Sequence, residues 1–161
     1  MADKPFWQSK AEPLLKSRFK VDFGGTLHWW AKSVTQPTME VSQNEYQIIN
    51  HKIKIPGIVT WTDIDIVFIE LGGKGKALYD KLLSFGYHPA PAVDGNDGMM
   101  KHNLNIKIEK FPNGDSDGTG KETWTLIDAM IKSINFSDLD YSSDDLVEVS
   151  LTVSYDRAKL S

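Results

Sequence analysis

The segment Asp145-Leu146-Val147-Glu148-Val149-Ser150-Leu151-Thr152-Val153-Ser154-Tyr155 decides the fold of this chain. From Val147 onward, an apolar side chain stands at every second position and a polar one between each pair. Successive side chains of a β-strand point to opposite faces of a sheet, so a period of two predicts a strand that buries one face.

The same period recurs in three other places, which centre on Val21, Ile66 and Ile106. Four such runs predict an antiparallel, mainly β domain, built as a sandwich or barrel-like structure over residues 1–161. One helix is expected at residues 76–85, where Leu78 and Leu82 repeat at helical spacing. Gly86 is a suitable residue to end that helix.

Two further segments, residues 26–36 and 122–136, are apolar on both faces. A strand of this kind is covered on both sides. In so small a domain the second cover comes either from a helix or from another subunit. Trp29 and Trp30 are adjacent, so on a strand they point to opposite faces, and one of them is a candidate subunit contact.

Glycine and proline mark the expected turns. Gly24-Gly25 is a suitable two-residue hairpin turn, and residues 113–120 form a long polar loop. Pro56-Gly57 is expected to end the strand 52–55 and to precede the strand that holds Trp61.

The composition excludes several kinds of site and several classes of protein. The chain has 161 residues, a net charge of −4 and no cysteine, which excludes disulfides, thiolate metal sites and a cysteine nucleophile. The mixed charges argue against a basic surface that wraps nucleic acid. No apolar run approaches the roughly 18–20 residues that cross a membrane, and the first residues do not have the pattern of a secretory signal.

The candidate chemical sites are incomplete. Asn113, Asp115 and Asp117 begin a calcium loop, but Trp124 stands where its closing glutamate belongs. The segment 72–76 has neither the spacing nor the hydroxyl residue of a phosphate-binding loop, and the histidines are scattered. The acidic segment 138–145 is expected to be a solvated turn. We therefore expect no enzyme activity, no cofactor and no metal site.

Several segments, in this order, resemble the tail tube protein of contractile-tailed bacteriophages. The pattern Phe19-Lys20-Val21-Asp22-Phe23 and the stretch Ala31-Lys32-Ser33-Val34-Thr35-Gln36-Pro37 resemble the opening of that family. Residues 50–66, with the strand Lys52-Ile53-Lys54-Ile55 and then Trp61-Thr62-Asp63, are similar to its hairpin. Residues 145–156 are similar to its closing strand. The same family includes the tubes of phage-derived bacteriocins and type VI secretion systems.

The resemblance implies a structural subunit of the virion tail, assembled in the host cytoplasm. Six copies would form a ring, their strands would join into one ring-wide β-barrel, and stacked rings would form a tube. The implied partners are further copies of the chain and the tail sheath, baseplate and tape-measure proteins. DNA would pass through the lumen into the host cell without sequence-specific binding, and no membrane partner is expected.

The hairpin of residues 39–66 is long for so small a domain, so we expect it to contact other subunits. The candidate contact residues are Trp29, Trp30, Tyr46, Ile48, Ile49, His51, Ile53, Ile55 and Ile58. The candidate lumen or polar-face residues are Lys52, Lys54, Asp63, Asp65 and Glu148. Three other functions stay open: a baseplate tube initiator, the tube of a bacteriocin or secretion machine, and a monomeric β-barrel that binds a ligand.

Overall fold

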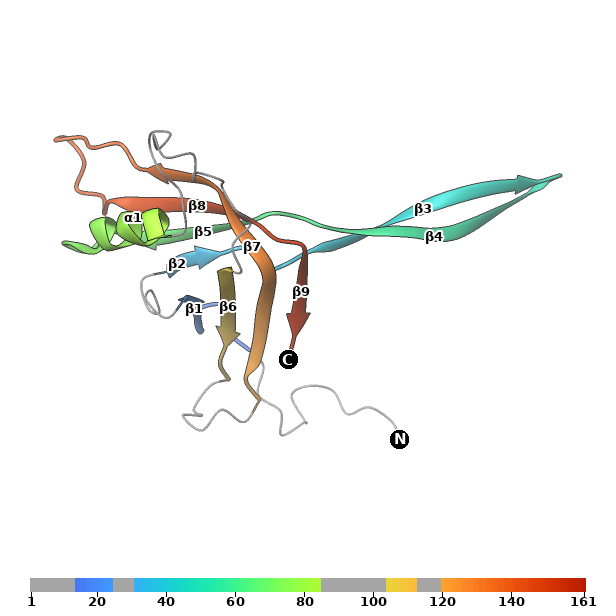
Figure 1. The fold of residues 1–161 in the computed structure, drawn as a ribbon, viewed down its shortest axis with the longest axis horizontal. Coiled ribbons are helices and arrows are strands. Elements are labelled where there is room, and N and C mark those ends of the chain that lie inside the picture. The colour runs from blue at the N-terminus through green and yellow to red at the C-terminus, as the bar shows by residue number, and fades with distance from the viewer. Residues whose placement is uncertain (1–13, 25–30, 85–103, 113–119) are drawn as a thin grey trace, which may run out of the picture.

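The computed structural model describes residues 14–24, 31–84, 104–112 and 120–161 of the chain (Figure 1). The described elements are β1 (Phe19–Phe23), β2 (Ala31–Val34), β3 (Met39–Ile48), β4 (His51–Trp61), β5 (Ile64–Ile69), α1 (Lys74–Ser84), β6 (Leu104–Lys110), β7 (Glu122–Phe136), β8 (Glu148–Ser154) and β9 (Arg157–Leu160). The strands are paired antiparallel, and the predicted mainly β fold with one helix is confirmed.

One long strand, β7, joins the two halves of the body. Its first part pairs with β6 and β9, and its residues 130–136 pair with β8. The order β1-β6-β7-β8-β5-β2 follows, with β9 beside β7. Figure 1 shows β7 bending between the two halves, close to Asp128, whose φ of 56° lies in the left-handed region. The described strands thus form two half-sheets that face each other without closing into a barrel.

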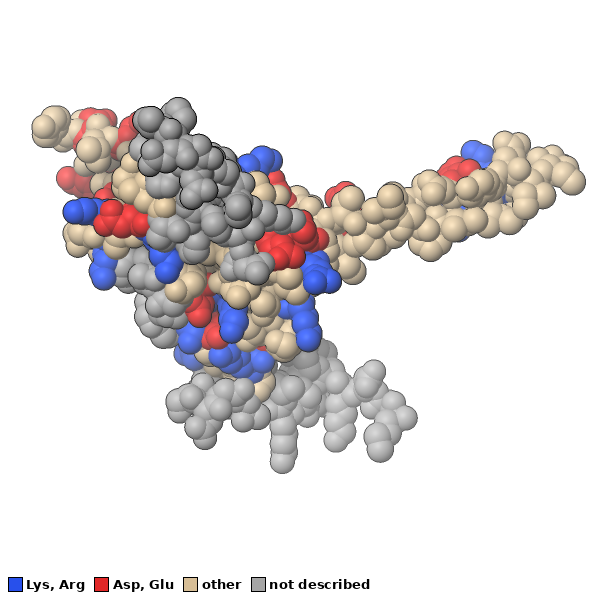
Figure 2. Space-filling model, viewed as in Figure 1, with Lys and Arg blue, Asp and Glu red and all other residues tan. Residues whose placement is uncertain are grey.

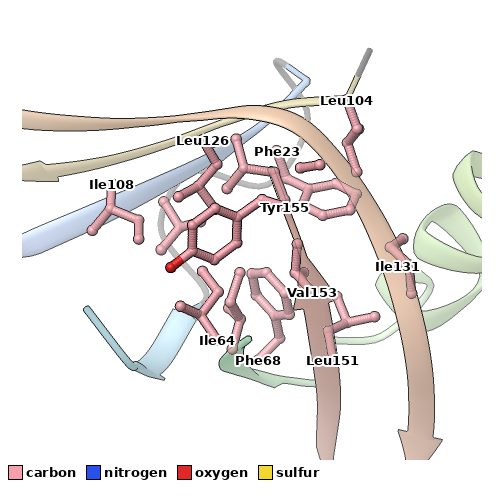
Figure 3. Packing of buried hydrophobic residues seen from close by; sticks show 14 of the residues in the cluster. Phe23, Ile64, Phe68, Leu104, Ile108, Leu126, Ile131, Leu151, Val153 and Tyr155 are labelled. Atoms are coloured by element: carbon pink, nitrogen blue, oxygen red, sulfur yellow. The ribbon is translucent and has the colours of Figure 1, made fainter. Parts of the chain in front are cut away.

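The core lies between these half-sheets, as Figure 3 shows. Alternate side chains of β8, Val149, Leu151 and Val153, are at most 2% exposed and meet the buried side chains of β5 and β6. Burying each such side chain contributes about 1.5–3 kcal/mol. Among the described residues, no polar or charged residue is buried. The alternation in the sequence therefore identifies the core face of β8 correctly.

Helix α1 covers one side of the core through Leu78 and Leu82, which are one turn apart and 3% and 5% exposed. It begins two residues before the predicted start, after a turn at Gly73, whose φ is +80°. Both leucines belong to the same core cluster as Val149, so α1 covers the core side of the sheet, and the second cover expected for residues 122–136 stays a prediction. No helix in the described part of the chain is long and apolar enough to cross a membrane.

The remaining two strands form a separate sheet that projects from the body (Figure 1). We call this two-stranded sheet, residues 39–61, the arm. Its turn lies at Ile49-Asn50, so the prediction that Pro56-Gly57 ends the strand is wrong. β4 continues through Pro56-Gly57 because a β-bulge accommodates the extra residue there. Pro56 is tolerated because β4 has β3 on one side only.

Candidate assembly surfaces

The arm exposes apolar side chains that a monomer would bury. All residues of β3 are exposed, and so are nearly all of β4. The large apolar residues exposed on the arm are Met39, Val41, Tyr46, Ile48, Ile49, Ile53, Ile55, Ile58 and Val59. A two-stranded sheet alone is at best marginally stable in water, and contiguous exposed apolar surface marks an interaction site. The arm therefore has the properties of an interaction surface.

Cross-strand pairing separates the outer part of the arm into an apolar and a charged face. Directly paired residues share a face, so Tyr46 and Ile53 lie together, next to the pair Ile48 and His51. On the other face, the ammonium groups of Lys52 and Lys54 each lie 3.7 Å from the carboxylate of Glu45. Both lysines thus lie on the charged face of the arm, away from the other predicted lumen residues.

The turn of the arm has an unusual backbone. Ile49 has a φ of 51° and is 86% exposed. Positive φ is rare for a β-branched residue and costs of order 1–3 kcal/mol. The Ile49 carbonyl accepts a hydrogen bond from the side-chain amide of Gln47 (3.4 Å). An apolar side chain is therefore held at the tip in a strained conformation, exposed to solvent.

A second surface lies on the outer side of the half-sheet that contains β5 and β8. Asp65 and Thr152 are paired there, and the Thr152 hydroxyl donates to the Asp65 carboxylate at 2.7 Å. Ser150 and Glu148 follow on the same face of β8. Ser133 and Asn135 of β7 extend the face, because they pair with Thr152 and Ser150. We call this surface the polar face.

Two ion pairs flank the polar face. Lys132 Nζ lies 2.7 Å from Asp63 Oδ2, and Lys32 pairs with Glu148. The hydrogen bond from Lys132 is the main reason that the pKa of Asp63 is lowered from its usual value of 3.8. The structure thus brings three predicted residues, Asp63, Asp65 and Glu148, to one surface. Two of these three carboxylates are matched by lysines, so the charge of the face is only weakly negative.

The half-sheet that carries the polar face has two strand edges without a partner in the described part of the chain. Among the described strands, β2 pairs with β5, and residues 132–136 of β7 pair with β8. A strand edge presents free N–H and C=O groups, which readily pair with another chain. Phe136 on the second edge is 42% exposed.

The acidic segment between β7 and β8 shows no sign of a metal site. It borders an open hollow of about 1040 Å³, together with Lys32 and Ile69. Asp140 accepts hydrogen bonds from the backbone N–H (2.9 Å) and hydroxyl (2.8 Å) of Ser142, which lower its pKa. Within the described ranges, no group of three or more His, Cys, Asp or Glu side chains could hold a metal ion.

Two of the predicted contact residues, Trp29 and Trp30, lie outside the described residues, as do residues 113–119 of the predicted loop 113–120. The other seven lie on the arm. Three further residues of the arm are not among those predicted from the sequence: Val41 and Val59 at its base, and Ser42 in the bulge. Val41 and Val59 are paired apolar residues in a segment with period two, so their spacing could have identified them.

Several solved structures share this fold. A chain in the cryo-EM structure of an extracellular contractile injection system, the PVC sheath/tube terminator in the extended state, matches with a TM-score of 0.72 and 21% identity over 95% of this chain and 99% of that chain. A chain of the PVC sheath–tube complex matches with a TM-score of 0.71 and 20% identity, covering 92% and 91%. A chain of the anti-feeding prophage cap, a tube-terminating cap, matches with a TM-score of 0.72 and 19% identity, covering 99% and 96%.

The fold is that of tail tube proteins. The resemblance in the sequence is thus confirmed at the level of the fold, over nearly the whole chain. No protein-family model and no curated protein matches the sequence significantly. The matched structures are parts of contractile injection systems, which connects the fold with assembled tubes and their ends.

Proposed function

We propose that this chain is a structural, non-enzymatic subunit of the tube of a contractile tail or injection system. The arm carries the proposal, because an exposed apolar two-stranded sheet on a tail-tube fold needs other subunits to cover it. Copies associate through two different surfaces of the chain, so each contact can repeat from copy to copy. A contact that closes on itself gives a ring, and one that does not close gives a stack of rings. Following the resemblance, the ring is a hexamer.

The free strand edges suggest how the ring closes. β2 of one copy pairs with residues 132–136 of β7 in the next copy, which extends the half-sheet around the ring. The polar face of every copy then lines the lumen. Its hydroxyl groups and matched ion pairs give a hydrophilic, weakly negative wall, along which DNA in a phage, or another cargo in an injection system, passes without binding tightly.

In this proposal the tube sits in a sheath, starts at a baseplate and is measured by a tape-measure protein, in a virion tail assembled in the host cytoplasm or in a related injection particle. The second candidate is the subunit that closes a tube end, since two of the similar structures are a tube terminator and a tube-terminating cap. A tube subunit polymerises alone, whereas an end subunit stops at a single ring.

Sedimentation velocity and negative-stain electron microscopy of the purified chain test the proposal. Rings or tubes are expected for the wild type, and a chain with Ile53→Asp and Ile55→Asp should stay monomeric while its far-UV circular dichroism is unchanged. The matched control is Gln43→Asp and Gln47→Asp, on the opposite face of the arm, which should still assemble. A wild type that stays monomeric at high concentration would overturn the proposal and favour the ligand-binding alternative.

A further inference from the structure

The apolar face of the ladder changes at the bulge in the arm. At the base, Met39 pairs with Trp61 and Val41 with Val59. Toward the tip, Tyr46 pairs with Ile53 and Ile48 with His51. Side chains alternate along β3, so Val41 and Tyr46, five positions apart, lie on opposite faces. The apolar face at the base is therefore opposite to the apolar face at the tip.

The two strands reach this change in different ways. In β3 the spacing of the apolar residues changes between Val41 and Tyr46. In β4, Ile53, Ile55, Val59 and Trp61 keep a spacing that a regular strand would place on one face. The bulge corrects this, because Gly57 and Ile58 together stand opposite the single residue Ser42.

Ser42 and Gly57 are fitted to this bulge. The Ser42 hydroxyl oxygen accepts a hydrogen bond from the Ile58 N–H at 2.8 Å. A Cβ at position 57 would lie 2.4 Å from the same oxygen, which only glycine avoids without rearrangement. The serine side chain at position 42 and the absence of a side chain at position 57 therefore allow the bulge to form at this place.

The arm also twists between base and tip. In Figure 1, β3 lies below β4 at the base and above it at the tip, so the viewer sees opposite faces of the ladder at the two ends. Two-stranded ribbons twist strongly, and a bulge increases the twist. Because the apolar face changes along with the visible face, the apolar side chains of base and tip point to the same side of the arm.

The charged side chains of the arm all lie on the side opposite to the apolar side chains. At the base, Glu40 pairs with Thr60 on the face opposite to Val59, and toward the tip the charged residues are Glu45, Lys52 and Lys54. One side of the arm is thus a neutral, apolar strip about 33 Å long, at roughly 3.3 Å per residue. An acidic or basic partner would need opposite charges on this side, which the strip does not have.

We infer that this bulge orients the arm so that one continuous apolar strip seats on a second copy of the chain. The inference rests on the proposed function and adds which side of the arm is buried and what sets it. Copies with a net charge of −4 repel each other, so a neutral strip is where identical chains can approach. The segment between β7 and β8, which lies at the end of the molecule opposite the arm (Figure 1), exposes Leu139, Tyr141 and Leu146 as apolar counterparts.

Single cysteines test which side is buried, since the chain has no cysteine of its own. Four variants are compared, Val59→Cys and Ile53→Cys on the strip and Thr60→Cys and Gln47→Cys on the other side. Assembly should slow thiol alkylation about tenfold or more at the strip positions and leave the other two unchanged. Protection of Thr60→Cys together with Ile53→Cys would show that the buried side follows a single ladder face, and would overturn the inference.

Removing the bulge gives an independent readout. Deletion of Gly57 keeps all other cross-strand pairs and the faces that they define, but it removes the bulge and its added twist. The apolar side chains of base and tip should then no longer share one side of the arm, so the concentration needed for assembly should rise about tenfold or more. Ser42→Ala, which loses one hydrogen bond, should raise it severalfold. Thr60→Ala is the matched control. If the deletion variant assembles like the wild type, the inference fails and the proposed function stands. A wild type that never assembles contradicts the proposed function instead.

Discussion

The indole of Trp61 packs on the ring of Tyr155, with centroids 6.0 Å apart and planes inclined by 52°. Trp61 is the last residue of the arm, and Tyr155 is 7% exposed at the junction of β8 and β9. The Thr62 N–H donates to the Thr38 carbonyl at 3.0 Å beside this contact. The arm is therefore joined to the core by its base, while the rest extends into solvent.

Replacing Trp61 should weaken the contact between the base of the arm and the core. Trp61→Ala removes a tilted aromatic pair and part of a half-buried side chain, so the free energy of unfolding should fall by about 1–3 kcal/mol. Urea unfolding followed by circular dichroism measures the change. Trp61→Phe keeps an aromatic ring and should lose less than half as much. Equal losses for both variants would show that the ring contact does not matter.

Acid should destabilise the chain through Glu109, which lies 2.8 Å from Lys20 and 2.9 Å from Lys121. Burial raises the pKa of Glu109, but the ammonium groups of the two lysines outweigh it, and the net pKa is below 4.5. The folded state thus binds fewer protons than the unfolded state between the two pKa values, so this contribution is complete above about pH 5 and is lost as the pH falls through the folded pKa.

The melting temperature measured from pH 7 to pH 3 tests this assignment. The wild type should lose stability below about pH 5, and Glu109→Gln should start less stable and lose less over the same range. Glu70→Gln, at an exposed site, is the control and should follow the wild-type curve. A Glu109→Gln curve parallel to the wild type would contradict the predicted role of this carboxylate.

The tip of the arm should become more stable when Ile49 is replaced by asparagine. Asn tolerates a positive φ better than Ile, so Ile49→Asn should relieve about 1 kcal/mol of strain at the turn. Amide hydrogen exchange of β3 and β4 should slow severalfold in the unassembled chain. Ile48→Asn, at a position without positive φ, should not slow exchange. Faster exchange in Ile49→Asn would mean that the turn prefers its native residue.

The sequence predicts elements well where one face is buried. The bounds of β7 agree with the predicted segment, and the helix differs by two residues at its start. The hairpin turn was misplaced because Pro-Gly is a stronger turn signal than Ile-Asn, and no local pattern shows that a bulge can absorb it. The sequence predicts Asp63, Asp65 and Glu148 as polar-face candidates, but it does not predict the contact between Asp65 and Thr152, since these two residues meet only through the pairing of β5 with β8.

The sharing of β7 between both half-sheets has a mechanical consequence. A force applied through the arm or by a neighbouring copy acts on strands of both half-sheets. The ladders of both half-sheets include β7, because β6 and β8 each pair with it. The halves cannot separate unless β7 leaves one of them, so the body yields as a single cooperative unit rather than half by half. A tube made of such subunits would transmit thrust along its length with little give inside each ring.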